Sequence, residues 1–300
     1  MGTITKRRED RKLLVIFSDM QSGHKLGLLN PDVVFSEKDE EGNPVSWQPR
    51  PTAIQDYLWE LFSGHVVDIR DLADGSPIVL IHNGDLTHGD KHKAILVSNR
   101  IADQFLIATA NFAPFLELPN LEAIRLTSGT PAHTFLFDTA PILVSELLCK
   151  ARPGLDVRVI HHGLLDIEGV LTDYAHHGPS PGIREWTSGN QLRYYATSCV
   201  SEHLRWGRSV PRLIVRSHYH DYRRETVYRQ HVKEGGRVIE KATDIIVTPS
   251  YSGLTEHGRQ VTRSIHWLVN GLVAVEIENG KLREVYPLCG MIDLRTKEAL

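Results

Sequence analysis

Four short apolar runs, each followed at once by polar residues, constrain the fold of this chain more than any other feature. They are KLLVIFS at 12–18, PIVLIH at 77–82, LEAIRL at 121–126 and RLIVR at 212–216. Continuous apolar runs of this length are typical of strands buried on both faces of a sheet. Segments 51–64 and 139–150 are predicted to be helices, the first because Pro51-Thr52 is a helix-start signal. The alternation of strands and helices predicts an α/β fold.

The rest of the chain extends this pattern. We predict helices at 92–114 and 190–206, a hairpin formed by 157–161 and 167–175, and strands at 244–248, 271–277 and 281–286. Residues 31–50 are rich in Pro, Gly, Asp and Glu and are predicted to be a loop insertion. Since no shift in composition divides the chain, we predict a single domain over 1–300. In this domain helices flank two mixed sheets, and strands within 250–300 complete the second sheet.

Composition argues against several classes of protein. No apolar run approaches the ~20 residues that span a bilayer, so we expect no membrane partner. The 3 cysteines are widely spaced without a CxxC pair, which fits a reducing compartment, and we expect a cytoplasmic protein. A net charge of −3 gives no overall basic field for nucleic acid. The local basic stretches, 205–216 and Arg223-Arg224, are more typical of a solvated face.

Aspartate and histidine side chains gather just after the predicted strands. The chain has 16 histidines, and histidine is the commonest metal ligand. The candidate residues are Asp19, Gln21, His24, Asp85, His88, Thr130, His133, His176, His177, His218 and His220. Ligands bind outside the carboxyl ends of strands in α/β sheets, so we expect these side chains to converge. Oxygen and imidazole donors suit divalent cations, and two carboxylates with several imidazoles are enough to hold two of them.

Taken in order, these motifs resemble the calcineurin-like metallophosphoesterase superfamily, whose pattern runs DxH, GDxxx, GNH(D/E), H and GHxH. The resemblance covers about residues 13–248 and implies an α/β/β/α sandwich. The segments SDMQSGHKLGL at 18–28 and GTPAH at 129–133 are also similar to those of phosphoesterases found in phage genomes. The resemblance therefore predicts a metal-dependent hydrolase.

The resemblance also implies a role for each matching residue. Asp19 corresponds to a ligand of the first cation and Asp85 to the carboxylate that bridges both cations. The remaining implied ligands are His176, for which His177 competes, and the pair His218 and His220, one for each cation. A simpler interpretation stands beside each role: Asp85 as part of an Asn-Gly-Asp turn, Asp19 as a cap, and the last pair as surface histidines.

Two positions depart from the superfamily pattern. Gln21 stands where a histidine is usual, and Thr130 stands where an asparagine is usual. Both are retained as candidate metal ligands through their side-chain oxygens. His133 is offset from the usual acid position and is the candidate general acid, with an ordinary loop histidine as the alternative. His88 is the second catalytic candidate, and His24 is expected near the site but outside the ligand set.

The function implied is hydrolysis of phosphomonoesters or phosphodiesters by a metal-bound hydroxide at a dinuclear site, with His133 protonating the leaving oxygen. Two divalent ions are expected; the donors favour manganese, with iron, zinc or magnesium as alternatives. One alternative is a DNA nuclease similar to the Mre11 group. An alternative of a different class is a catalytically degraded accessory protein that binds nucleic acid, which the departures at Gln21 and Thr130 suggest.

Overall fold

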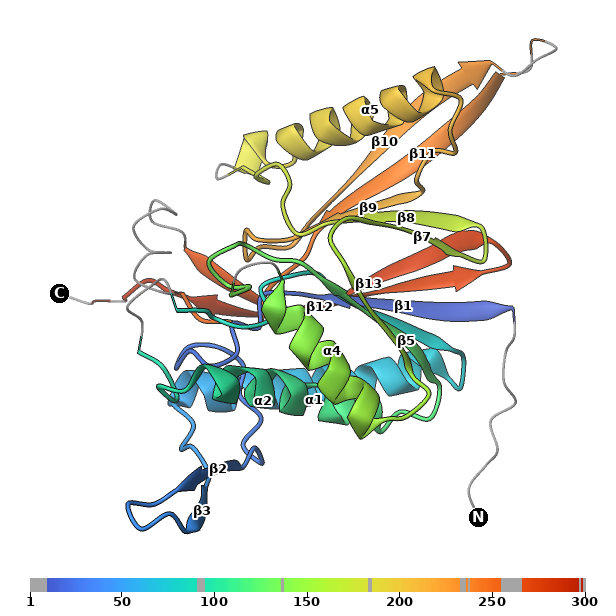
Figure 1. Ribbon diagram of the computed structural model, residues 1–300. Coiled ribbons are helices and arrows are strands. Elements are labelled where there is room, and N and C mark those ends of the chain that lie inside the picture. The colour runs from blue at the N-terminus through green and yellow to red at the C-terminus, as the bar shows by residue number, and fades with distance from the viewer. Residues whose placement is uncertain are drawn as a thin grey trace.

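Two large mixed sheets form the centre of the protein (Figure 1). The computed structural model describes residues 10–90, 95–135, 138–182, 185–232, 236, 238–254, 266–296 and 298. The first sheet has the strand order β13-β12-β1-β4-β5-β6. Its strands are β1 Arg11–Phe17, β4 Ile78–His82, β5 Leu121–Thr127, β6 Asp156–Ile160, β12 Trp267–Glu278 and β13 Lys281–Asp293. Strands β1, β4, β5 and β6 run parallel, whereas β12 pairs antiparallel with β1 and β13 pairs antiparallel with β12.

The second sheet has the strand order β10-β11-β9-β8-β7. Its strands are β7 Gly163–Ile167, β8 Val170–Tyr174, β9 Leu213–Arg216, β10 Arg223–Val232 and β11 Val238–Val247. Strands β8, β9 and β11 are parallel, and hairpin partners close both edges of the sheet. The carboxyl ends of its parallel strands lie at the same end of the molecule as those of the first sheet, because β1 and the loop after β11 meet in a bridge between Ser18 and Ser250.

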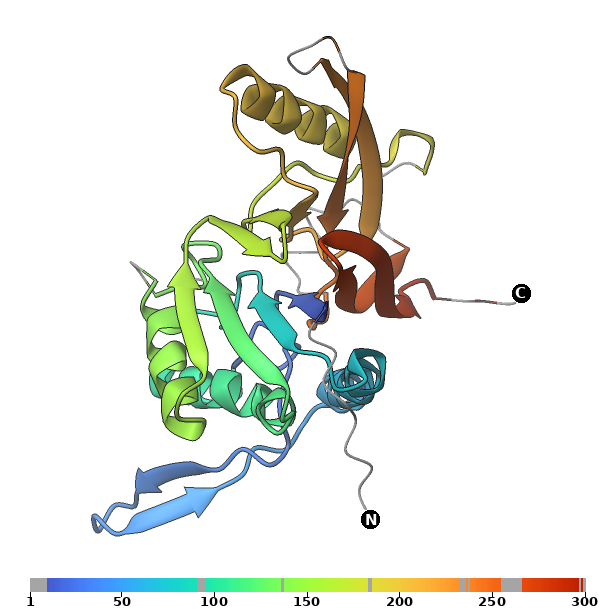
Figure 2. The same cartoon turned by 90° about the vertical axis from the view of Figure 1, so that its right-hand side faces the viewer.

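Helices cover the outer face of each sheet, so that the described residues form four layers (Figures 1 and 2). Helices α1 Ala53–Ala73, α2 Ile101–Asn111, α3 Ala113–Leu116 and α4 Thr139–Ala151 lie on the first sheet, and α5 Asn190–Arg205 lies on the second. Strand β1 illustrates how the layers are held together. Its residues Leu13, Val15 and Phe17 pack against the helices, whereas Leu14 and Ile16 pack against the second sheet. A strand buried on both faces needs the continuous apolar run seen in the sequence.

The structure confirms most of the predicted elements, extends one helix and shows a hairpin inside the predicted loop. The strands at 12–18, 77–82, 121–126 and 212–216 correspond to β1, β4, β5 and β9, and the helices at 139–150 and 190–206 correspond to α4 and α5. Helix α1 continues past Gly64 to Ala73 because Val66 and Ile69 carry on its buried face. The predicted loop insertion at 31–50 contains a small hairpin, β2 Phe35–Lys38 with β3 Pro44–Trp47, which projects from the helical side (Figure 2).

Three predictions were wrong. The helix expected at 92–114 begins only at Ile101; residues 91–94 lie outside the described residues, and 95–100 are not helical. Residues 157–161 do not pair with 167–175. Residues 157–160 belong to β6, which joins β5 in the first sheet, and the hairpin partner of β8 is β7. The C-terminal strands β12 and β13 do not complete the second sheet, because β12 pairs with β1 in the first. Local patterning identifies a strand but not its long-range partner.

No helix among the described parts of the chain combines the length and the apolar character that crossing a membrane requires.

Candidate metal centre

The loops after the central strands continue the pairing of the strands and so bring distant polar residues together. Phe17 of β1 pairs with His82 of β4. Beyond this pair, the backbone N–H of Asp19 donates to the carbonyl of Gly84 (3.0 Å), and that of Gln21 donates to the carbonyl of Asp85 (3.2 Å). In the second sheet, the N–H of Ser217 donates to the carbonyl of His176 (2.9 Å). Two sheets therefore present their loop side chains to one shared space.

Asp85 lies at the centre of this space. Its carboxylate is 2% exposed, and Oδ1 accepts a 2.6 Å hydrogen bond from the backbone N–H of Thr130. Oδ2 lies 3.3 Å from Nε2 of His176 and 3.7 Å from Nε2 of His133. Burial by itself raises the pKa of Asp85, but the facing His176 and His133 outweigh burial and hold the pKa well below its ordinary value. The carboxylate is therefore charged and available to a cation.

Asp19, which is fully buried, forms a second pair with the partly exposed His220. Oδ1 of Asp19 lies 3.2 Å from Nε2 of His220, whose Nδ1 is 3.2 Å from the Ser252 hydroxyl. Burial by itself raises the pKa of Asp19, but His220 and His176 outweigh it and lower the pKa. Within the described residues Asp19 Oδ1 accepts no well-formed hydrogen bond. A buried carboxylate oxygen of this kind costs free energy unless a positive group faces it.

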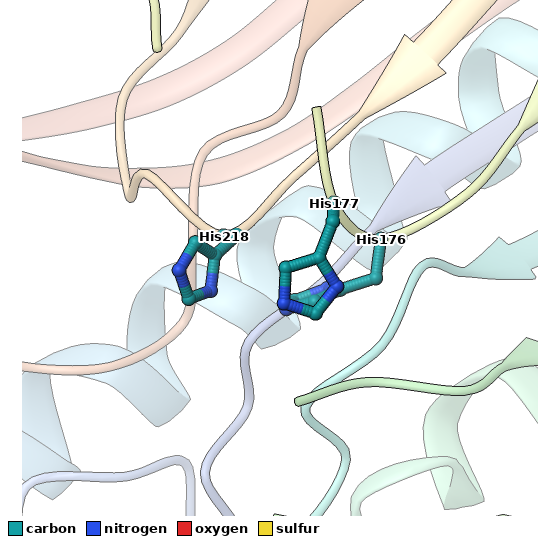
Figure 3. Close-up of side chains that lie close together, drawn as sticks. All are labelled: His176, His177 and His218. Carbon is teal, nitrogen blue, oxygen red and sulfur yellow. The ribbon is translucent and has the colours of Figure 1, made fainter. Parts of the chain in front are cut away.

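Three imidazoles from the second sheet's loops surround the same point (Figure 3). The ring centroids of His177 lie 4.8 Å from those of both His176 and His218, and the rings of His176 and His218 are 5.3 Å apart. Nδ1 of His176 donates to the carbonyl of Asn83 (2.7 Å), because a carbonyl only accepts, and Nε2 is left to face Asp85. Burial by itself lowers the pKa of His176, but Asp85 and Asp19 outweigh burial and raise the pKa to about 9.

Both histidines of the 176–177 pair lie at the site, His176 buried and His177 exposed at its rim. Burial and the neighbouring His176 lower the pKa of His218 to about 4 and also lower the pKa of His177. At neutral pH these two rings are therefore neutral imidazoles, the form in which histidine binds metal ions. The donor atoms of the three rings lie within 4.8 Å of one another, as do those of Asp19, Asp85 and His176.

The two departures from the superfamily pattern have different surroundings. The hydroxyl of Thr130 lies 3.2 Å from Asp85 Oδ2 and 3.4–3.5 Å from a nitrogen of each of the three imidazoles. The side-chain nitrogen of Gln21 donates to Asp85 Oδ2 (3.3 Å), since a carboxylate only accepts. The amide oxygen of Gln21 accepts from Nδ1 of His88 (3.1 Å). Gln21 therefore links His88 to Asp85, whereas Thr130 faces the cluster directly.

His88, His133 and His24 form a row of rings beside the cluster. The rings of His88 lie 4.4 Å from His24 and 5.4 Å from His133. His133 donates from Nδ1 to the carbonyl of His88, which leaves its Nε2 toward Asp85. Nδ1 of His24 accepts from the backbone N–H of Leu26 (3.0 Å), and burial together with His133 lowers the pKa of His24 to about 4. His133 is thus the member of this row that faces the candidate ligands.

Backbone conformation marks the site as well. Left-handed φ angles are rare for residues other than glycine, and five candidate residues have them: Asp19 (52°), Gln21 (48°), Asp85 (52°), His218 (77°) and His220 (51°). Residues held in sparsely populated conformations cluster at functional sites, where the surrounding structure maintains the strain. The conformation turns each side chain back from its loop toward the shared space between the sheets.

Several supporting residues were not singled out from the sequence. A Cβ on Gly84 would lie 2.3 Å from Nδ1 of His176, and one on Gly129 would lie 2.2 Å from Oδ1 of Asp85. Asn83 of the first sheet's loop donates to the carbonyl of Ala175 (2.9 Å) and to Ser217 (2.7 Å), which joins the two sheets. The adjacent glycines in Asn-Gly-Asp and Ser-Gly-Thr were the available signal, because close approach of a side chain to backbone requires glycine.

No family model matches the chain, and a search of curated proteins finds no match either.

The donor set itself fits divalent cations. Asp19 supplies a buried carboxylate oxygen that faces His220, and Asp85 is a charged carboxylate grouped with Asp19 and His176. The ring of His176 is oriented by the carbonyl of Asn83. Carboxylates together with imidazoles whose rings are oriented by carbonyl acceptors are typical of sites for borderline divalent metals.

Proposed function

We propose that the protein is a metal-dependent phosphoesterase of the calcineurin-like metallophosphoesterase superfamily, with the sandwich fold of that superfamily. The observation that carries this proposal is the position of Asp85. Its carboxylate lies between two sets of candidate ligands. One set is Asp19 with His220, and the other is His176 with His218. A carboxylate shared between two cations is the defining element of dinuclear hydrolytic sites. The four layers and the order of the motifs support the same assignment.

In this proposal Asp19, Asp85 and His220 hold the first cation, and Asp85, His176 and His218 hold the second. Manganese is the first ion to test. When bound, the cations polarise a phosphoryl oxygen and lower the pKa of a bound water. The protein's own contribution is orientation: the Asn83 carbonyl fixes the ring of His176, and the Thr130 N–H fixes the carboxylate of Asp85.

His133 is the proposed proton donor to the leaving oxygen. Its Nδ1–H is occupied by the carbonyl of His88, so proton exchange with a substrate takes place at Nε2, the nitrogen that faces Asp85. A general acid must lie within hydrogen-bond reach of the leaving oxygen, and Nε2 of His133 faces the space beside Asp85 where a phosphoester would bind. His88, held by Gln21, is proposed to position His133 through its backbone carbonyl.

A small phosphoester is the proposed substrate. The arginine pair at 223–224 offers little to a nucleic acid, because Arg223 lies 3.4 Å from Asp221 and Arg224 lies 2.9 Å from buried Asp244. Pairing of this kind neutralises the charge that a phosphate backbone would meet.

The test is manganese-dependent hydrolysis of p-nitrophenyl phosphate and bis-p-nitrophenyl phosphate, compared with single- and double-stranded DNA. We expect turnover of at least one small ester, and loss of it in His133→Asn with metal content retained. If the metal-loaded wild type hydrolyses none of these substrates, while binding DNA equally well with and without Asp85→Asn, the phosphoesterase assignment is wrong and a nucleic-acid-binding protein remains.

A further inference from the structure

His177 faces the candidate second cation from the solvent side. It follows His176 directly after β8, and the two rings are nearly perpendicular, with an interplanar angle of 87°. In Figure 3 the ring of His177 lies in front of that of His176, and His218 comes from the neighbouring loop, with its ring centroid 4.8 Å from that of His177. Nε2 of His177 lies 3.5 Å from the Thr130 hydroxyl, the same distance as Nε2 of His176. His177 therefore directs a ring nitrogen to the same place as the proposed ligand His176.

More polar atoms surround the Thr130 hydroxyl than its single proton can serve. The Thr130 hydroxyl has one proton, and Oδ2 of Asp85, Nε2 of His177 and Nδ1 of His218 lie within 3.5 Å of it. Nε2 of His176 also lies 3.5 Å away and faces Asp85. In the tautomers of His177 and His218 whose proton sits on the other ring nitrogen, the two nitrogens near Thr130 offer lone pairs to the same point. Several lone pairs that converge without protons between them suit a cation better than a hydrogen-bond network.

We propose that His177 is a third imidazole ligand of the second cation, so that this site consists of Asp85, His176, His177 and His218. The inference rests on the proposed function and adds a ligand to it. His177 thus supplies the nitrogen donor at a site where Thr130 replaces the expected asparagine. Ligands at 2.0–2.1 Å from one zinc ion lie about 3.3 Å apart, and the three donor atoms already lie within 4.8 Å of one another. Because His177 is exposed, its side chain has room to rotate toward a bound ion.

A site with three imidazoles has a distinct ion preference. Imidazole suits zinc, iron, cobalt and nickel, whereas magnesium takes oxygen ligands and water. The second site is therefore expected to bind Co²⁺ or Zn²⁺ and to discriminate strongly against Mg²⁺. The first site, in which His220 is the proposed imidazole beside two carboxylates, is expected to discriminate less.

The experiment is a calorimetric and visible-absorption titration of the chelator-treated, full-length protein with Co²⁺ alone. Three variants are compared with the wild type: His177→Ala, the exposed neighbouring control His161→Ala, and Thr130→Val, which removes the hydroxyl but keeps the shape. We expect two binding steps in the wild type and in His161→Ala. In His177→Ala one step weakens by at least about tenfold and its absorption band changes. In Thr130→Val both steps persist.

Two results would overturn the inference while leaving the proposed function intact. In the first, His177→Ala binds two Co²⁺ ions with wild-type affinity and spectrum, and only inhibition by inorganic phosphate weakens, which makes His177 a phosphate contact. In the second, Thr130→Val loses the step that His177→Ala retains, which makes the threonine oxygen the ligand. Failure of the wild type to bind any Co²⁺ would remove the proposed function itself, together with this inference.

Discussion

Nε2 of His176 lies 3.3 Å from Oδ2 of Asp85, and this contact joins the two sheets at their carboxyl ends. His176 follows β8 of the second sheet, and Asp85 follows β4 of the first. The other nitrogen of the ring is held by the carbonyl of Asn83, two residues before Asp85. Both sides of one imidazole are thus fixed by a single loop of the opposite sheet, which orients Nε2 before any ligand arrives.

Asp85→Asn should abolish metal binding at both positions and all hydrolysis while preserving the fold. The substitution keeps the shape of the side chain but removes the charge that faces His176 and His133. Metal content by elemental analysis and far-ultraviolet circular dichroism measure the two effects. Asp71→Asn, at an exposed position of α1, is the matched control and should retain both ions. Wild-type turnover in Asp85→Asn would rule out the bridging role.

Gln21→His should tighten the first cation by about tenfold, because it places an imidazole where the present amide contacts Asp85. The substitution also removes the acceptor that holds Nδ1 of His88. Calorimetric titration of the metal-free protein measures the gain. Gln191→His, on the exposed side of α5, controls for an added surface histidine. An unchanged affinity would show that position 21 supports His88 and has no access to the cation.

Gly129→Ala should displace Asp85 and weaken metal binding, because the added Cβ would lie 2.2 Å from Oδ1 and 2.3 Å from the backbone nitrogen of Asp85. Crowding of this kind costs on the order of 1–3 kcal/mol of unfolding free energy. Gly64→Ala is the matched control, since no atom lies within 4 Å of its added Cβ. Inside helix α1 it should stabilise the protein by about 0.5–1 kcal/mol. Urea unfolding and metal titration are measured for both variants. We expect lower stability and weaker metal binding in Gly129→Ala alone.

His82→Leu should reduce the loss of stability in acid. Burial lowers the pKa of His82 to about 3, below the ordinary value of 6.5. Between pH 6.5 and pH 3, His82 is protonated in the unfolded chain but stays neutral in the folded protein. The unfolding free energy therefore falls as the pH drops from 6.5 toward 3. Each such proton changes the unfolding free energy by about 1.4 kcal/mol per pH unit.

The measurement is the urea unfolding free energy of the metal-free protein between pH 4 and pH 7. The dependence of the unfolding free energy on pH should be weaker in His82→Leu by at most one proton, because one titratable group is removed. Part of the dependence should remain, because the pKa values of His24 and His218 are also lowered, to about 4. An equal slope in the variant would mean that the His82 ring is protonated in the folded state.

The strands of the core were predictable because burial on both faces leaves a local signature. β1 is apolar at every position from Leu13 to Phe17, since alternate residues meet the helices and the second sheet. The partner of β6 was not predictable, because its contact with β5 joins segments about thirty residues apart and nothing local specifies it. Helix α2 was placed too early because the apolar residues Ile95 to Val97, which precede the helix, were counted as part of its apolar face.

The candidate ligands were predictable from their positions after strands, but their contacts were not. Nothing local indicates that the amide of Gln21 turns to His88, or that Thr130 faces three imidazoles. The choice between His176 and His177 was posed as exclusive, whereas the loop after β8 brings both rings to the cluster. These relations depend on left-handed backbone at Asp19, Gln21 and Asp85, which side-chain identity alone does not reveal.

The candidate metal ligands come from loops of both sheets. A bound ion would therefore stabilise the contact between the two sheets. A cation that binds only the folded chain adds about 2.7 kcal/mol at a free concentration one hundred times its dissociation constant. Such an ion would act across the layer interface where Asn83 reaches Ser217. Chelation should therefore loosen the junction between the layers first and leave the helix-covered outer faces ordered, so that amide exchange would report ion loss at β8 and β9 before α1.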